Sequence, residues 1–255
     1  MGIKISLEQL RDYQERVKSW RKFIEARKGT EFNKEQNTTV KFIIPLLEIL
    51  GWRSFSKDVE FEYHLKDKRH KTRHVDIALY LFDKNPKIPK ILVEVKSIPR
   101  TSQDDMKHPA HQVFRDYLRA NKVTYGILTN GIKLILFDKR FVRYDSKTAR
   151  PLFAIKLKDF IEFSDVLWLL SKHMVENGKL DELVEMYHHE FYRPWFFPKR
   201  DMIKNKEFDK LAKIYKTDWE KKTGSKEQNE YMLRLVFAKK FLSGKNDESA
   251  DLARA

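Results

Sequence analysis

The segment most suggestive of chemistry is an apolar run that carries two charged side chains, Glu94 and Lys96. Side chains alternate across a β-strand, so both would lie on one face of an otherwise apolar strand. A preceding apolar run carries one carboxylate, Asp76, near its start. Carboxylates bind Mg²⁺ or Mn²⁺, and such an ion beside an ammonium group can hydrolyse a phosphodiester through an activated water. Taken alone, Glu-x-Lys favours the other interpretation, an ordinary buried ion pair.

The elements around these residues predict an α/β fold with one mixed sheet flanked by helices. Helical spacing of apolar residues predicts helices over 7–28 and 34–50; Pro45 should kink the second, and Gly51 closes it. The loop 83–89 has hairpin composition, so Asp76 can approach the Glu-x-Lys strand. The other predicted elements are strands over 58–65, 74–82, 90–97, 123–129 and 132–138, with a helix over 109–121 before the last two strands.

The sequence pattern changes near residue 150, after which the segments are mostly helical, and we place a domain boundary there. Residues 1–150 form the predicted core domain, and 151–243 form a mostly α-helical region for DNA binding or dimerisation. Residues 244–255 read as a disordered tail. The helical segments expected in this region are 156–171, 179–192, 201–222 and 225–243.

Charge is the dominant feature of the composition. The 255 residues include 52 Lys and Arg against 37 Asp and Glu, giving a net charge of +15. Such a surplus favours a polyanionic partner, nucleic acid above all, although a lysine-rich solvated surface of a thermophile protein fits equally well. The sequence has no cysteine, which excludes disulfides and thiolate chemistry. With no apolar run of membrane-spanning length and no signal-peptide segment, we expect a soluble cytoplasmic protein.

Several short motifs occur in an order that resembles a known family. Asp76 followed by Glu94-x-Lys96 is similar to the active-site pattern of PD-(D/E)XK nucleases. The flanking motifs narrow the resemblance to the N-terminal nuclease domain of type I restriction enzyme R proteins, over about residues 31–140. These motifs are Glu35-x-x-Thr38, Phe42 to Trp52, Val75 to Tyr80, a helix with Gln112 and Tyr117, and Leu128-Thr129-Asn130-Gly131.

The resemblance implies a restriction-endonuclease-like core and a role for each matching residue. Asp76 and Glu94 would be metal ligands for Mg²⁺ or Mn²⁺, with the Val95 carbonyl as a third, and Lys96 would be the catalytic lysine. Glu35 would be an accessory carboxylate, or else a helix N-terminal charge meeting the dipole. Gln112 would touch DNA or the metal's water. The sequence departs from the family in placing Tyr117 five residues after Gln112 rather than four, and in lacking the proline of the motif's name.

A basic hairpin precedes the Asp76 strand and could hold a phosphate backbone, although an exposed turn would have the same composition. Its candidate nucleic-acid-binding residues are Lys66, Lys68, Arg69, Lys71 and Arg73. The sequence has no Gly-x-x-x-x-Gly-Lys-Ser/Thr phosphate loop, so any ATP-driven translocase or helicase would be a separate partner.

These observations predict a metal-dependent deoxyribonuclease, an endonuclease acting on DNA. Cleavage of both strands by subunits with one site each favours a homodimer, with the C-terminal helices as the interface. The alternative from another class is a non-catalytic nucleic-acid-binding protein that retains the nuclease fold. It predicts salt-sensitive binding without metal-dependent cleavage.

Overall fold

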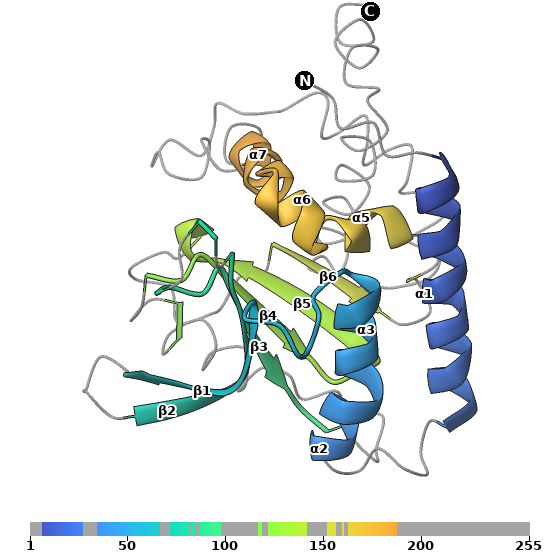
Figure 1. Cartoon of the computed structure of the whole chain (residues 1–255), viewed down its shortest axis with the longest axis horizontal. Helices are drawn as coiled ribbons and strands as arrows, with labels where there is room; N and C mark the ends of the chain where they lie inside the picture. The colour runs from blue at the N-terminus through green and yellow to red at the C-terminus, as the bar shows by residue number, and fades with distance from the viewer. Residues whose placement is uncertain are drawn as a thin grey trace, which may run out of the picture. The chain divides into compact units, whose positions relative to one another are not determined.

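A computed structural model describes residues 7–27, 35–66, 72–81, 83–84, 87–97, 117–118, 122–141, 152–156, 160 and 163–187. The chain divides into two compact units, Met1–Ser164 and Asp165–Ala255. The first unit holds a six-stranded mixed sheet with helices beside it, which confirms the predicted α/β class (Figure 1). Among the described residues, no helix has the length and apolarity that crossing a bilayer requires.

The strands follow one another across the sheet in chain order, β1-β2-β3-β4-β5-β6. Neighbours are antiparallel except β3 and β4, which are parallel. A parallel pair needs a long crossover, and the connection from β3 to β4 is the segment in which the helix 109–121 was predicted. Only Tyr117 and Leu118 of that predicted helix lie within the described residues. The strands are β1 (Val59–Lys66), β2 (Thr72–Leu79), β3 (Ile91–Val95), β4 (Tyr125–Thr129), β5 (Lys133–Asp138) and β6 (Phe153–Lys156).

Strands β1 to β5 agree with the predicted strands to within a few residues. Strand β6 was not predicted, because its four residues lie next to the segment 156–171 that helical spacing had suggested. It pairs antiparallel with β5 and extends the sheet past residue 150. The predicted roles of the regions on either side of that point stay predictions.

The central strands are buried on both faces, as expected for strands covered on two sides. All five residues of β3 and all five of β4 are buried. Tyr117 and Leu118, from the crossover, pack into the apolar cluster of one face. That cluster also contains Ala78, Tyr80, Leu92, Leu128, Ile135 and Phe137.

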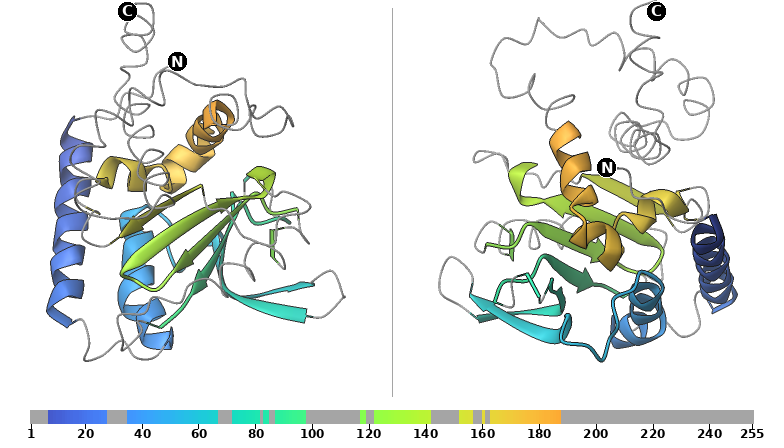
Figure 2. Two further views of the ribbon diagram at one scale, coloured as in Figure 1. Left: turned by 180° about the vertical axis from the view of Figure 1, so that it is seen from behind. Right: turned by 45° about the horizontal axis from the view of Figure 1, so that its top comes forward.

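Helix α1 (Leu7–Arg27) has the predicted bounds within one residue and lies beside the next helical segment (Figure 2). Its buried stripe recurs every three or four residues, at Tyr13, Val17, Trp20 and Ile24. The Trp20 indole N–H donates to the Phe42 carbonyl at 2.9 Å. This bond fixes the helix to the segment that carries Glu35.

The predicted helix 34–50 is continuous but changes its winding. It consists of α2 (Glu35–Thr38), a π-helical turn η1 (Thr39–Ile43) and α3 (Ile44–Ile49). Pro45 has no N–H to offer the preceding turn, so the distortion that was predicted there takes the form of a π turn just before it. Gly51, at φ 81°, ends the helix, and the Trp52 N–H donates to the Leu47 carbonyl at 2.9 Å.

In the second unit the described helices are α5 (Ser164–Trp168, whose first residue still belongs to the first unit), α6 (Lys172–Glu176) and α7 (Lys179–Tyr187). Helix α5 lies within the predicted helix 156–171 and α7 within 179–192, whereas α6 falls between the two predicted segments. Lys156, the predicted start of the first helix, is instead the last residue of β6. The predicted helices 201–222 and 225–243 and the predicted tail 244–255 lie outside the described residues.

Candidate active site

The two strands that carry the acidic residues are adjacent and in register. Ile77 of β2 pairs with Val93 of β3, and Asp76 and Glu94 are each the next residue along. The Asp76 Oδ2 accepts the Val95 backbone N–H at 2.6 Å, so this side chain takes the place of a backbone partner at the end of the ladder. The predicted approach of Asp76 to the Glu-x-Lys strand is therefore present.

Lys96 follows β3 directly and is held in place through both its backbone and its side chain. Its N–H donates to the Thr129 carbonyl of β4 at 2.8 Å. Its Nζ donates to Glu94 Oε1 at 2.7 Å and to Glu35 Oε1, from helix α2, at 2.8 Å. One ammonium group thus bridges two carboxylates that are far apart in the sequence.

Three carboxylates converge here, and Glu35, Asp76 and Glu94 each offer an oxygen within 4.8 Å of the others. We call these three residues and Lys96 the carboxylate end of the sheet. Glu94 is only 5% exposed, and its Oε2 is buried with no hydrogen-bond partner among the described residues. Buried carboxylate oxygens normally have partners, so this atom has spare capacity for a cation. The donor set, all oxygens, fits Mg²⁺ or Mn²⁺.

The electrostatics of the site follow from burial and crowding. Burial raises the pKa of Glu94 to about 7, with Lys96 opposing the shift and Asp76 adding to it. Burial also raises the pKa of Asp76, against the hydrogen bond from Val95. Burial lowers the pKa of Lys96, but the carboxylates of Glu94 and Glu35 outweigh it, so the net shift is upward and the ammonium stays charged.

Two further residues, Tyr117 and Glu62, adjoin the site. The sequence left the role of Tyr117 open and did not point to Glu62. The Tyr117 hydroxyl donates to the His74 carbonyl at 3.2 Å, and burial together with the Glu94 carboxylate raises the pKa of this phenol. Glu62 lies in β1 where the ladder skips one pair, between Phe61–Ile77 and Tyr63–Val75, and its φ is 53°. Its carboxylate also contributes to the raised pKa of Asp76. A left-handed glutamate inside a strand leaves no signal in residue spacing.

The other predicted site residues are only partly described. Gln112, Lys68, Arg69 and Lys71 lie outside the described residues, as does the side chain of Lys66. Arg73 is half-buried on β2, opposite Leu65 of β1. At the base of the same hairpin the rings of the paired residues His64 and His74 lie 4.2 Å apart. The roles of the hairpin residues and of the Val95 carbonyl stay predictions.

Comparison with known proteins finds a family that matches the segment containing these site residues. Residues 36–155 match the family model for the type I restriction enzyme R protein N terminus, which confirms the predicted resemblance. The matched range includes β2, which carries Asp76, and β3, which carries Glu94. No curated protein matches the chain. Among solved structures, a chain of "cryoEM structure DrdV-DNA complex" has 15% identity and a TM-score of 0.39, covering 66% of this chain and 98% of its own length. A likeness at that level supports no further conclusion.

Proposed function

We propose that the chain, whose residues 36–155 match the type I R protein N-terminal family, is a Mg²⁺- or Mn²⁺-dependent DNA endonuclease of the PD-(D/E)XK type. The observation that supports this most is the convergence of Glu35, Asp76 and Glu94 around one buried, unpartnered oxygen. In an ordinary buried ion pair both carboxylate oxygens normally have a donor.

Each residue has a distinct task in this proposal. Asp76, Glu94 and the Val95 carbonyl would hold the ion, with Glu35 completing its shell. When bound, the ion would neutralise charge on the attacked phosphate and lower the pKa of a water molecule. The Lys96 ammonium would orient that water and offset the charge that develops on the phosphate. The bond that breaks joins phosphorus to its leaving oxygen, and the water supplies the new P–O bond.

Two finer proposals concern assembly. A single carboxylate end serves one strand, so cutting duplex DNA favours a homodimer. Any ATP-driven translocation would come from a helicase or translocase acting with this chain.

The decisive experiment is cleavage of supercoiled plasmid and single-stranded DNA with Mg²⁺, for the wild type, Asp76→Ala and Lys96→Ala. Loss of the lysine should slow cleavage by roughly 100- to 1,000-fold, as for other charge-stabilising donors. Asp12→Ala and Lys22→Ala, which remove exposed charges of the same types from α1, are the matched controls. Equal cutting by all five proteins would refute the assignment, and salt-sensitive binding without cutting would favour the non-catalytic alternative.

A further inference from the structure

The end of the sheet opposite the carboxylates is built from connections that are distant in sequence but adjacent in space. Backbone hydrogen bonds join them in a row: Tyr80 N–H to the Asp58 carbonyl at 2.8 Å, Lys90 N–H to Leu79 at 2.8 Å, and Lys139 N–H to Thr124 at 2.9 Å. These bonds link the start of β1, the end of β2, the start of β3, the start of β4 and the end of β5.

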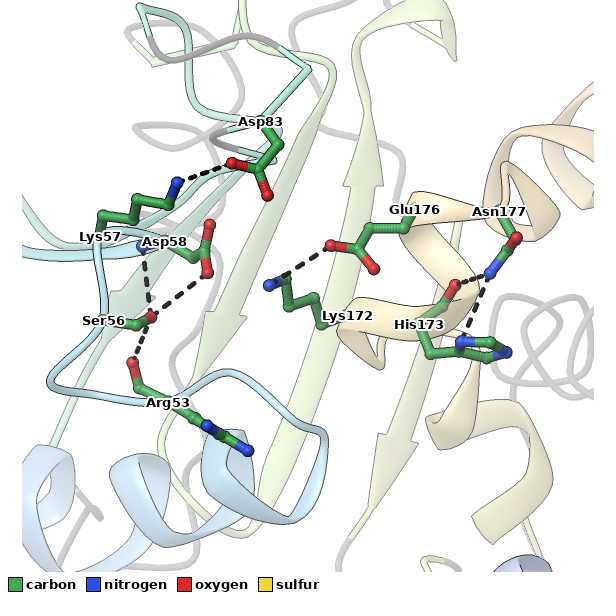
Figure 3. Close-up of polar contacts among 9 residues, drawn as sticks. All are labelled: Arg53, Ser56, Lys57, Asp58, Asp83, Lys172, His173, Glu176 and Asn177. Carbon is green, nitrogen blue, oxygen red and sulfur yellow. Dashed lines mark hydrogen bonds and ion pairs between the residues drawn. The ribbon is translucent and has the colours of Figure 1, made fainter.

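Basic residues gather on this row, which we call the basic end. Its cationic residues are Arg53, Lys57, Lys84, Lys87, Lys90, Lys122, Lys139 and Arg140. The acidic residues in the described part of the same connections and strand ends are Asp58, Glu60, Asp83 and Asp138, and two of these are buried. Asp83 is paired with Lys57 at 2.6 Å (Figure 3), and Asp138 is paired with Arg140 at 2.7 Å. With eight cationic residues against four acidic ones, this end of the sheet has a cationic surplus.

An aromatic side chain projects from the same end. Phe55, between α3 and β1, is 104% exposed, against 37% for Phe23 on α1. The loop around it is nevertheless fixed. The Ser54 N–H and hydroxyl both donate to Glu48, the first at 2.7 Å. The Ser56 N–H donates to the Arg53 carbonyl at 2.9 Å, and the Ser56 hydroxyl donates to the same carbonyl at 2.8 Å (Figure 3). The protein therefore holds a bare ring in water on an ordered backbone.

We propose that the basic end binds a single-stranded segment of nucleic acid, with phosphates along the cationic row and one base stacked on Phe55. A ring that is open on both faces suits an unpaired base, whereas the bases of a duplex already stack on one another. An acidic protein segment would satisfy the lysines but would give no particular use to an exposed phenylalanine on an ordered loop.

The dimensions agree with a nucleic-acid strand. The row from β1 to β5 crosses four strand spacings, about 19 Å, which is long enough to contact several successive phosphates of one strand. Along β3, the distance from Lys90 to Glu94 is about 13 Å at the usual rise per residue. The inference rests on the proposed function for its partner, and it narrows the substrate to DNA with an unpaired stretch near the cut.

Binding can be tested separately from cleavage by working in EDTA. Fluorescence anisotropy of a short labelled oligothymidylate and of a blunt duplex of equal length would be compared for the wild type, Phe55→Ala and the control Phe23→Ala. Phe55→Ala should weaken single-strand binding by roughly 5- to 100-fold, the range found when a stacking ring is removed, and leave duplex binding unchanged. Wild-type affinity in Phe55→Ala, or an equal loss in Phe23→Ala, would overturn the proposal.

The cationic row has its own test in the salt dependence of binding. The triple variant Arg53→Gln, Lys84→Gln, Lys87→Gln should reduce the slope of log affinity against log salt by about 2, since each lost single-strand phosphate contact contributes about 0.7. Arg11→Gln, Lys18→Gln, Lys22→Gln removes as many exposed charges from α1 and should leave the slope almost unchanged. Equal slopes in the two triples would contradict the proposal.

The outcomes also separate the two claims made for the molecule. Binding that depends on Phe55 without Asp76-dependent cleavage would leave the basic end in place and refute the nuclease assignment. Asp76-dependent cleavage with binding that ignores Phe55 would do the reverse. Circular dichroism melting of each variant verifies that the fold is intact.

Discussion

Two buried carboxylates, one at each end of the sheet, differ in how completely their oxygens are satisfied. Asp138, 0% exposed, accepts bonds from the Arg140 guanidinium at 2.7 to 3.2 Å and from the Arg140 N–H at 2.6 Å. Glu94 has one oxygen on Lys96 and no donor among the described residues bonded to the other, since the neighbouring Tyr117 hydroxyl donates to His74 instead. A saturated buried acid stabilises a fold, whereas an unsaturated one has capacity to bind. The same residue chemistry thus serves structure at the basic end and points to function at the carboxylate end.

The largest expected effect comes from neutralising the unsaturated acid. Glu94→Gln keeps the shape of the side chain, so the metal-free protein should melt near the wild-type temperature. Mg²⁺-dependent cleavage should fall by roughly 100-fold or more, and the rise in melting temperature on adding Mg²⁺ should disappear. An unchanged Mg²⁺ shift would remove Glu94 from the metal site.

The matching change at the other end should affect stability instead. Asp138→Asn leaves the Arg140 guanidinium without its anionic partner and should reduce the free energy of unfolding by about 2 kcal/mol. Urea unfolding would measure this. The Mg²⁺ shift at a temperature where the variant is folded should equal that of the wild type, and its loss would mean that the two ends are coupled.

Acidity should act on the carboxylate end through Glu94. The pKa of this carboxyl is raised to about 7 in the metal-free protein. Below that pH a Mg²⁺ ion must displace the proton from Glu94 in order to bind, whereas above it Glu94 is already ionised. Mg²⁺ affinity should therefore fall up to about tenfold per pH unit below 7 and level off above it. Isothermal titration in buffers of different ionisation enthalpy would detect the released proton, and a flat profile between about pH 6 and 8 would contradict the expectation.

The smallest effect concerns the turn beside Lys96. Gly131 has φ 84°, and an added Cβ would lie 3.3 Å from the Phe42 ring, so Gly131→Ala should cost about 1–2 kcal/mol of stability. Gly178→Ala, at φ 72° with open space around it, isolates the backbone strain and should cost less. Thermal melting compares the two, and an equal loss would show that the Phe42 contact contributes nothing.

The sequence predicted the arrangement of the site correctly where the charged residues follow the two-residue alternation of a β-strand. The alternation of Glu94 and Lys96 in an apolar run, with Asp76 one hairpin earlier, was enough to predict that the three groups meet. Glu35 joins them through tertiary packing of α2, which the family resemblance implied and residue spacing alone did not.

The features that sequence reasoning missed depend on contacts between distant segments or on local departures from regular geometry. The basic end gathers lysines and arginines from four connections between residues 53 and 140, and residue spacing does not show that these connections meet at one end of the sheet. The left-handed Glu62 interrupts β1 without any glycine to mark it. Strand β6 is only four residues long, too short for periodicity to separate it from a helix.

The position of Lys96 affects the stability of the protein in the absence of a bound metal ion. Clustered acids repel one another and would push the helix carrying Glu35 away from the sheet. The lysine acts as an internal counterion, so the carboxylates of Glu35 and Glu94 can stay close together without a bound cation. Under the proposed function, chelation should therefore yield a folded but inactive protein that cleaves DNA again when Mg²⁺ is added back. Small zinc domains differ, because they unfold when their metal is removed.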